Sequence, residues 1–178
     1  DDTGDGLSSA GAWRTLARAL PELRAGGTLL FAEGEYLVPD EPPAPLAGGA
    51  TGIALLGRGR DRVVLRGTLQ LSGTTDLRFE RLEFHGGVQA QDGANLRFRN
   101  CRFHGGAGLT VQGVRGLRLT QSIFSELSGP SLRLRGCTRV FLRGNLFAQD
   151  GGSAVHADAP EAFEYSDYNL YCNPDQAW

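Results

Sequence analysis

The segment "DLRFERLEFHG", residues 76–86, is followed 19 residues later by "NLRFRNCRFHG", residues 95–105. The aromatic residue near the end of each copy recurs further along the chain at spacings of 19, 21, 23 and 24 residues. The recurring aromatic positions are Phe84, Phe103, Phe124, Phe147 and Tyr171. Similarity at a regular interval of about 20 residues is the signature of a repeat architecture. The repeats therefore decide the fold.

Two apolar columns lie earlier in each repeat, two residues apart. The first consists of Leu69, Val88, Leu109, Leu132 and Val155. The second consists of Leu71, Ala90, Val111, Leu134 and Ala157. Apolar residues that alternate with a period of two predict a strand with one buried face. We therefore expect at least two short strands in each repeat, each paired in parallel with its equivalent one repeat away around a shared core.

This pattern predicts an all-β fold, a right-handed parallel β-helix of about six coils. Leucine-rich horseshoes and propellers fit poorly, since the first need dense Leu spacing with an inward Asn and the second need repeats of about 40 residues. We expect one domain over residues 1–178. Its expected parts are an N-terminal segment with a cap helix (1–27), first coils with a Pro-rich loop (28–67), five repeats (68–173) and a tail (174–178).

An amphipathic helix is predicted over residues 11–24, with Ser8 or Ser9 as its N-cap. Its apolar stripe consists of Trp13, Leu16, Ala17, Leu20 and Leu23. We expect this helix to cover the open N-terminal end of the solenoid, where strand edges would otherwise be exposed. Two short strands are expected on either side of Glu33 and Gly34.

Composition excludes several classes of protein. A net charge of −2 and a pI near 5.9 give no basic field for nucleic acid, and no apolar run is long enough to span a membrane. The three cysteines form no CxxC pair. His85 and His104 share a column, but no carboxylate joins it, so we interpret them as turn residues and expect no metal site. No cofactor is evident, and calcium is left open without support.

Two segments resemble the right-handed parallel β-helix, or pectin-lyase-like, superfamily of bacterial carbohydrate-active proteins. Residues 13–38, "WRTLARALPELRAGGTLLFAEGEYLV", resemble the entry motif of that family, and residues 166–174, "SDYNLYCNP", resemble a segment common in its secreted members. The resemblance implies a secreted or periplasmic protein. Because the chain starts at Asp1 and contains no Met, we expect a processed or excised N-terminal piece of a longer β-helix.

Outward positions of the earlier strand predict a saccharide groove. Between and beyond the two apolar columns lie two polar files, which are Gln70, Gln89, Thr110, Arg133 and His156, and Ser72, Gln91, Gln112, Arg135 and Asp158. Amide and guanidinium groups match sugar hydroxyls and carboxylates. We expect Gln70, Gln89, Gln91 and Gln112 to bind substrate. The alternative is that these positions are polar in any soluble β-helix and that the glutamines form a ladder of their own.

The later strand carries an outward file of Arg78, Arg97 and Arg118. Positive charges about 4.8 Å apart repel one another unless anionic groups neutralise them. An acidic polysaccharide would do so, and we therefore add these arginines to the expected substrate-binding residues. The neighbouring Asp76, Glu80 and Glu83 would do so as well.

The expected catalytic cluster lies in the last two repeats and consists of Arg133, Arg135, Asp150, His156 and Asp158. Glycoside hydrolysis needs two carboxyl groups, for which Asp150 and Asp158 are the candidates. Elimination from a uronate needs a base and a cation that neutralises the carboxylate, for which His156 and the two arginines are suited. The alternative is that His156 and Asp158 form an ordinary surface pair.

The sequence thus indicates a secreted β-helix that binds or processes polysaccharide, with a glycosidase-like or lyase-like parent. A non-catalytic structural or adhesive module is the alternative, and whether the protein is an enzyme stays open. The expected partner is a polysaccharide, acidic in the arginine interpretation, and neither nucleic acid nor membrane. We expect a monomer unless the C-terminal end of the solenoid pairs with another copy.

Overall fold

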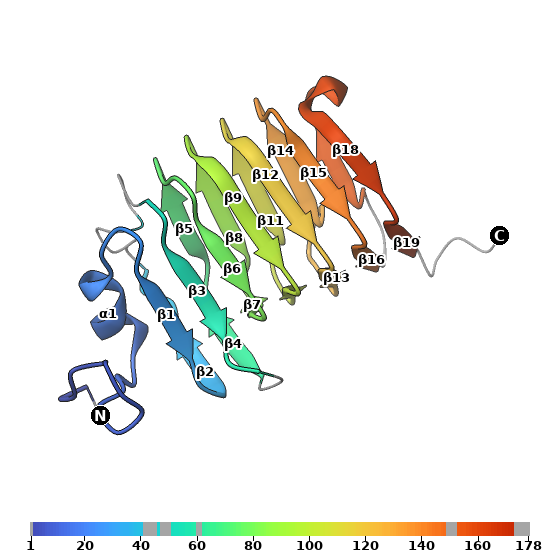
Figure 1. Cartoon of the computed structure of the whole chain (residues 1–178). Coiled ribbons are helices and arrows are strands. Elements are labelled where there is room, and N and C mark those ends of the chain that lie inside the picture. Colours follow the sequence, from blue (N-terminus) through green and yellow to red (C-terminus); the bar gives the residue numbers. More distant parts are fainter. Residues whose placement is uncertain (1, 41–45, 47–50, 60–61, 149–152, 173–178) are drawn as a thin grey trace.

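A computed structural model describes residues 2–40, 46, 51–59, 62–148 and 153–172. In these residues the chain winds into a parallel β-solenoid of about six turns, with one short helix near the N-terminus (Figure 1). The predicted all-β parallel solenoid is confirmed. Each complete coil contributes one strand to each of three parallel sheets. The sequence predicted at least two strands in each repeat, and the structure contains three.

Sheet 1 contains the strands that precede the repeated Phe column. Its strands, in spatial order, are β1 (Thr28–Phe31), β3 (Ala54–Gly57), β6 (Arg78–Glu80), β9 (Ala94–Arg99), β12 (Arg115–Thr120), β15 (Val140–Arg143) and β18 (Phe163–Asp167). All neighbours pair in parallel, and a register shift between Val140 and Phe141 is the one irregularity in the described pairs.

Sheet 2 carries the recurring aromatic residue. Its strands are β2 (Gly34–Leu37), β4 (Val63–Arg66), β7 (Glu83–His85), β10 (Arg102–His104), β13 (Ile123–Ser125), β16 (Leu146–Ala148) and β19 (Leu170–Cys172). The sequence columns are reproduced as strand registers, because Phe84, Phe103, Phe124, Phe147 and Tyr171 lie opposite one another on successive strands.

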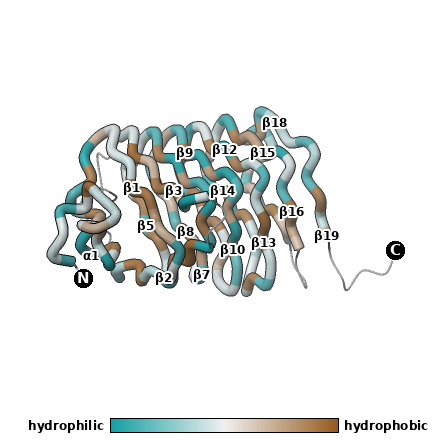
Figure 2. The backbone as a smooth tube through the Cα atoms, turned by 60° about the horizontal axis from the view of Figure 1, so that its bottom comes forward, coloured by the Kyte–Doolittle hydropathy of each residue, from teal (hydrophilic) through white to brown (hydrophobic). Residues whose placement is uncertain are grey.

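Sheet 3 carries the two earlier apolar columns and both predicted polar files. Its strands are β5 (Leu69–Ser72), β8 (Val88–Gln91), β11 (Leu109–Gln112), β14 (Leu132–Arg135) and β17 (Val155–Ala157). From β5 to β14 the apolar residues are buried, while the residues between them reach solvent or lie partly exposed. In Figure 2, hydrophobic and hydrophilic residues alternate along the strands, as a one-sided core requires.

The core is a stack of like side chains. The ring centroids of Phe103 and Phe124 lie 4.5 Å apart with 4° between the ring planes, and Phe84 and Phe147 extend the stack at 5.0 Å on either side. All four rings are at most 1% exposed. The single interior column of phenylalanines is therefore confirmed, and Tyr171 continues it at 5.1 Å while staying 47% exposed.

A second inward stack lies at the turn between sheets 1 and 2. Asn145 donates through Nδ2 to the carbonyl oxygen of Leu119, and its Oδ1 accepts from the backbone N–H of Ser122. Ser122 occupies the equivalent place one coil before Asn145 and Cys101 two coils before it, where burial raises the pKa of the Cys101 thiol to about 12. The interpretation of Cys101 as a packing residue agrees with this environment, since a thiol held protonated is a poor nucleophile.

The N-terminal helix is shorter than predicted. It consists of α1 (Leu16–Ala19) and a following 3-10 turn, η1 (Leu20–Glu22). Thr15, and not Ser8 or Ser9, is the N-cap, and its Oγ1 accepts from the backbone N–H of Arg18. Pro21 has no N–H with which to extend the α-helical hydrogen bonds, so the α-helix gives way to the tighter turn.

The helix nevertheless packs against the first coil. Leu16 and Leu20 are buried in the same core cluster as Phe31 of β1, while Ala17 is exposed instead of joining the apolar stripe. A second 3-10 turn, η2 (Pro160–Ala162), precedes β18. No helix in the described ranges is long and apolar enough to span a bilayer.

Candidate functional site

The outer face of sheet 3 carries the polar files that the sequence predicted. The first file runs in register from strand to strand as Gln70, Gln89, Thr110, Arg133 and His156. The second runs as Ser72, Gln91, Gln112 and Arg135. We call these nine residues, together with Asp158, the glutamine face. The structure thus brings the four predicted substrate-binding glutamines together.

This face is hollowed along the solenoid axis. A groove of about 220 Å³ is lined by polar side chains of β5, β8 and β11, including all four glutamines. A second hollow of about 310 Å³ follows it and is lined by Arg133 and Arg135 of β14, with Ser128 and Pro130 at its rim. Both are lined by Thr110 and Gln112, so they form one track from an amide-rich end to a cationic end.

Most of the glutamine amides have no partner within the described residues. Gln91 donates through Nε2 to Ser72 Oγ at 3.3 Å, whereas the side chains of Gln70, Gln89 and Gln112 form no hydrogen bond there. A self-supporting ladder would bond amide to amide on adjacent coils. The ladder interpretation therefore accounts for little of this face, and the amides are free to contact a ligand.

The predicted catalytic cluster is assembled only in part. His156 lies beside Arg133 on the neighbouring strand. Asp158 Oδ2 accepts a hydrogen bond from the backbone N–H of Gly136 at 2.8 Å. Asp150 lies outside the described residues. Within the described part, no hydrogen bond joins His156 to Asp158 or to either arginine, so this end of the groove offers cationic and imidazole groups but no bonded acid and base pair.

Comparison of the chain with protein-family models, curated proteins and solved structures gives no match.

Sheet 1 carries the predicted arginine file, and the structure extends it. Arg78, Arg97 and Arg118 lie opposite one another on β6, β9 and β12, and Phe141 and Tyr165 continue the same file on β15 and β18. Sequence reasoning missed these two aromatic residues. Their signal was present, because each lies six positions before the recurring aromatic of its repeat, as the three arginines do.

The acidic residues expected to neutralise this file have different partners in the structure. Glu80 pairs with Arg78 and with Arg81. Asp76 accepts a hydrogen bond from Asn95 Nδ2 at 2.9 Å, and Glu83 lies on sheet 2. Among the described residues, an ion pair therefore neutralises only Arg78 of this file, and the interpretation that Asp76 and Glu83 would neutralise the file is wrong. Arg97 forms no ion pair or hydrogen bond through its side chain in the described part of the chain.

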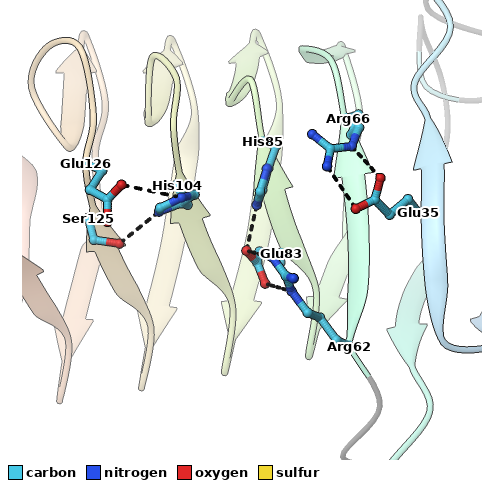
Figure 3. Close-up of polar contacts among 8 residues, drawn as sticks. All are labelled: Glu35, Arg62, Arg66, Glu83, His85, His104, Ser125 and Glu126. Carbon is cyan, nitrogen blue, oxygen red and sulfur yellow. Dashed lines mark hydrogen bonds and ion pairs between the residues drawn. The ribbon is translucent and has the colours of Figure 1, made fainter.

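The outer face of sheet 2 is a network of paired side chains (Figure 3). Arg62 donates through Nε and Nη2 to the two carboxylate oxygens of Glu83, both at 2.9 Å, and His85 Nε2 lies 2.6 Å from Glu83 Oε1. The hydrogen bonds from Arg62 are the main cause that lowers the pKa of Glu83 to about 2. An ionised carboxylate only accepts, so Nε2 of His85 carries the proton.

His85 and His104 were expected in turns, but they are the last residues of strands β7 and β10, so that interpretation is wrong. The rings of His85 and His104 lie 5.0 Å apart between centroids. His104 Nδ1 lies 3.4 Å from Ser125 Oγ, and its Nε2 lies 3.7 Å from Glu126 Oε2 (Figure 3). Among the described residues, no group of three or more His, Cys, Asp and Glu side chains is placed to hold a metal ion.

Proposed function

We propose that the protein binds a polysaccharide chain along the glutamine face. The observation that carries this proposal is the continuous groove in which amide side chains are repeated from coil to coil, three of the four without a partner among the described residues. Amides donate and accept hydrogen bonds, as sugar hydroxyls do. A row of such groups about 4.8 Å apart offers repeated contacts to a polymer built from repeating sugar units.

The resemblance of residues 13–38 and 166–174 to the pectin-lyase-like superfamily supports the same proposal and extends it to a secreted or periplasmic protein. The parallel solenoid agrees with this family but is compatible with others, because fold alone does not specify function.

A second candidate is cleavage of the bound chain by elimination. It is favoured by the neighbouring positions of Arg133 and His156 at the cationic end of the groove. There Arg133 would neutralise a uronate carboxylate, and His156 would accept the proton from the carbon next to it. The glycosidic C–O bond then breaks, a C=C bond forms in the uronate, and the released sugar oxygen takes a proton from water. This role adds turnover to binding and leaves the proposed groove unchanged.

Binding is tested with pectin, alginate, xylan and glycosaminoglycans, measured by affinity electrophoresis and calorimetry. The double variant Gln89→Ala/Gln112→Ala is expected to weaken binding of the preferred polymer about five- to tenfold, since two sets of hydrogen bonds are lost. Thr28→Ala, an exposed strand position on sheet 1, is the control and should bind as wild type does. Absence of binding to every polymer, or equal binding by the double variant, would overturn the proposal.

Turnover is tested on the same panel through reducing ends and the absorbance of unsaturated uronate. Product formation that His156→Ala abolishes would support cleavage. Binding without product from any polymer would reject cleavage and leave the binding function.

A further inference from the structure

We infer a second binding site, on sheet 1, for an anionic saccharide bearing carboxylate or sulfate groups. The site is a cleft of about 440 Å³ that we call the arginine cleft. Its side chains include Arg97, Arg115, Arg118, Arg139, Phe141 and Tyr165, with Asn95 and Glu164. It lies on a different sheet from the glutamine face, so it does not rest on the function proposed above.

The cleft gathers four arginines, and among the described residues only Arg139 has an ion-pair partner. Arg97 and Arg118 are exposed and directly opposite each other on β9 and β12. Arg97 and Arg115 form no ion pair or hydrogen bond through their side chains within the described residues. Guanidinium groups on adjacent coils, about 4.8 Å apart at the backbone, repel one another. A bound anion would relieve this repulsion and would be held by charge-assisted hydrogen bonds.

One guanidinium is already oriented. Arg118 lies over the Phe141 ring at 4.4 Å from its centroid, and Tyr165 stacks on the other side of that ring at 4.7 Å with 14° between the planes. A cation over an aromatic face is attracted by the ring quadrupole. The stack therefore holds Arg118 in place, which lowers the entropy cost of using it to bind a ligand.

Gly116 helps to hollow the cleft. It lines the cleft together with Asn95 and Arg139, and it adds no side chain of its own. Its φ is +86°, and a Cβ at this position would come within 2.9 Å of Asn95 Oδ1. A side chain at position 116 would therefore crowd Asn95, so glycine fits this part of the cleft.

The chemistry favours a saccharide over a nucleic acid. A single-stranded nucleic acid is held by bases stacked on open aromatic faces. Both faces of Phe141 are already covered, by Arg118 and by Tyr165. Glu164, which lies 3.4 Å from Arg139, can accept hydrogen bonds from sugar hydroxyls, and Asn95 can both donate and accept.

The test is calorimetric titration of the folded chain with oligogalacturonate and with its fully methyl-esterified, uncharged form. Wild type is expected to bind the charged form and to lose this binding as salt is raised, since ions screen exposed charges. The variant Arg97→Gln/Arg118→Gln is expected to bind at least about tenfold more weakly, because two charge-assisted contacts are lost. The matched control, Arg58→Gln/Arg102→Gln, removes two exposed arginines outside the cleft and should bind as wild type does.

Further outcomes separate this inference from the proposed function. A loss confined to Arg133→Gln/Arg135→Gln would place the anion on the glutamine face, overturning the inference while the proposed function stands. Equal loss in the matched control, equal binding of the esterified form, or no binding of oligogalacturonate would overturn it as well. Tighter binding of a single-stranded oligothymidylate than of an oligogalacturonate of equal charge would also overturn the inference. Loss in Arg97→Gln/Arg118→Gln with the control unchanged supports the cleft, even if no polymer depends on Gln89 and Gln112.

Discussion

The outer faces of sheets 2 and 3 use their polar side chains in different ways. On sheet 2, Glu83 is held by two hydrogen bonds from Arg62 and lies within hydrogen-bonding distance of His85, and Glu35 is held by two from Arg66 at 2.6 and 2.8 Å. On sheet 3, the amides of Gln70, Gln89 and Gln112 bond to no other described residue.

The paired side chains of sheet 2 are expected to stabilise the fold, whereas the unpaired side chains of sheet 3 are available to bind a ligand. Polar groups that satisfy one another add to the stability of the fold and have little left to offer a ligand. Polar groups that face only water contribute little to stability, and their donors and acceptors are free for recognition. We therefore expect substitutions on sheet 2 to change unfolding, and substitutions on sheet 3 to change binding.

The largest effect is expected from Glu83→Gln. Glu83 is 8% exposed, and the change removes the charge that Arg62 and His85 face. We expect the free energy of unfolding to fall by about 1–3 kcal/mol, since a hydrogen bond to a charged group is lost in a partly buried place. Urea unfolding followed by circular dichroism measures this.

The matched control is Glu126→Gln, at the residue directly after β13 of the same sheet. The Glu126 side chain is 71% exposed and lies 3.7 Å from His104, so its loss should change the free energy of unfolding by less than about 0.5 kcal/mol. Equal changes in the free energy of unfolding of the two variants would contradict the view that paired side chains on sheet 2 stabilise the fold.

The effect of Glu83 is expected to depend on pH. Hydrogen bonds from Arg62 and His85 lower the pKa of Glu83 from 4.5 to about 2. A lowered pKa means that the folded state binds the proton less readily, so this stabilisation is fully present above pH 4.5 and is lost as the pH falls towards 2. The difference in unfolding free energy between wild type and Glu83→Gln should shrink over that range. A difference that stays constant would show that the carboxylate charge is not its source.

The sequence predicted the side-chain columns that repeat from coil to coil. It missed the ion pairs whose two members occupy different positions in neighbouring coils. The Phe84 column and both files of the glutamine face follow from period-two alternation within aligned repeats, which fixes inward and outward positions. Glu83 was expected to neutralise arginines near it in the sequence. It lies on β7 of sheet 2, where its partner Arg62 comes from the coil before.

Two other misses have local causes. Helical periodicity over residues 11–24 ignored Pro21, which cannot donate a backbone hydrogen bond, so the α-helix ends at Ala19. The arginine file was recognised in the sequence by its charge, and the prediction therefore included only Arg78, Arg97 and Arg118. Phe141 and Tyr165 continue it because strand register depends on position in the coil and not on residue type.

A smaller effect is expected from Arg66→Gln. This arginine also makes two hydrogen bonds to a carboxylate, but its side chain is 46% exposed and that of Glu35 is 53% exposed. Exposed ion pairs contribute little to stability, so the midpoint of thermal unfolding should shift only slightly, and the shift should be smaller in high salt. A loss as large as that of Glu83→Gln would mean that burial does not distinguish the two pairs.

The smallest effect on stability is expected from Gln89→Ala/Gln112→Ala. Neither amide bonds to another described residue, and both side chains are exposed, so the free energy of unfolding should change by less than about 0.5 kcal/mol. Urea unfolding of the double variant beside Glu83→Gln measures the contrast directly. A loss above about 1 kcal/mol would show that the glutamines stabilise the coils, as the ladder interpretation holds. If stability is unchanged while polysaccharide binding falls, the run of amides on this face is explained by the ligand and not by the fold.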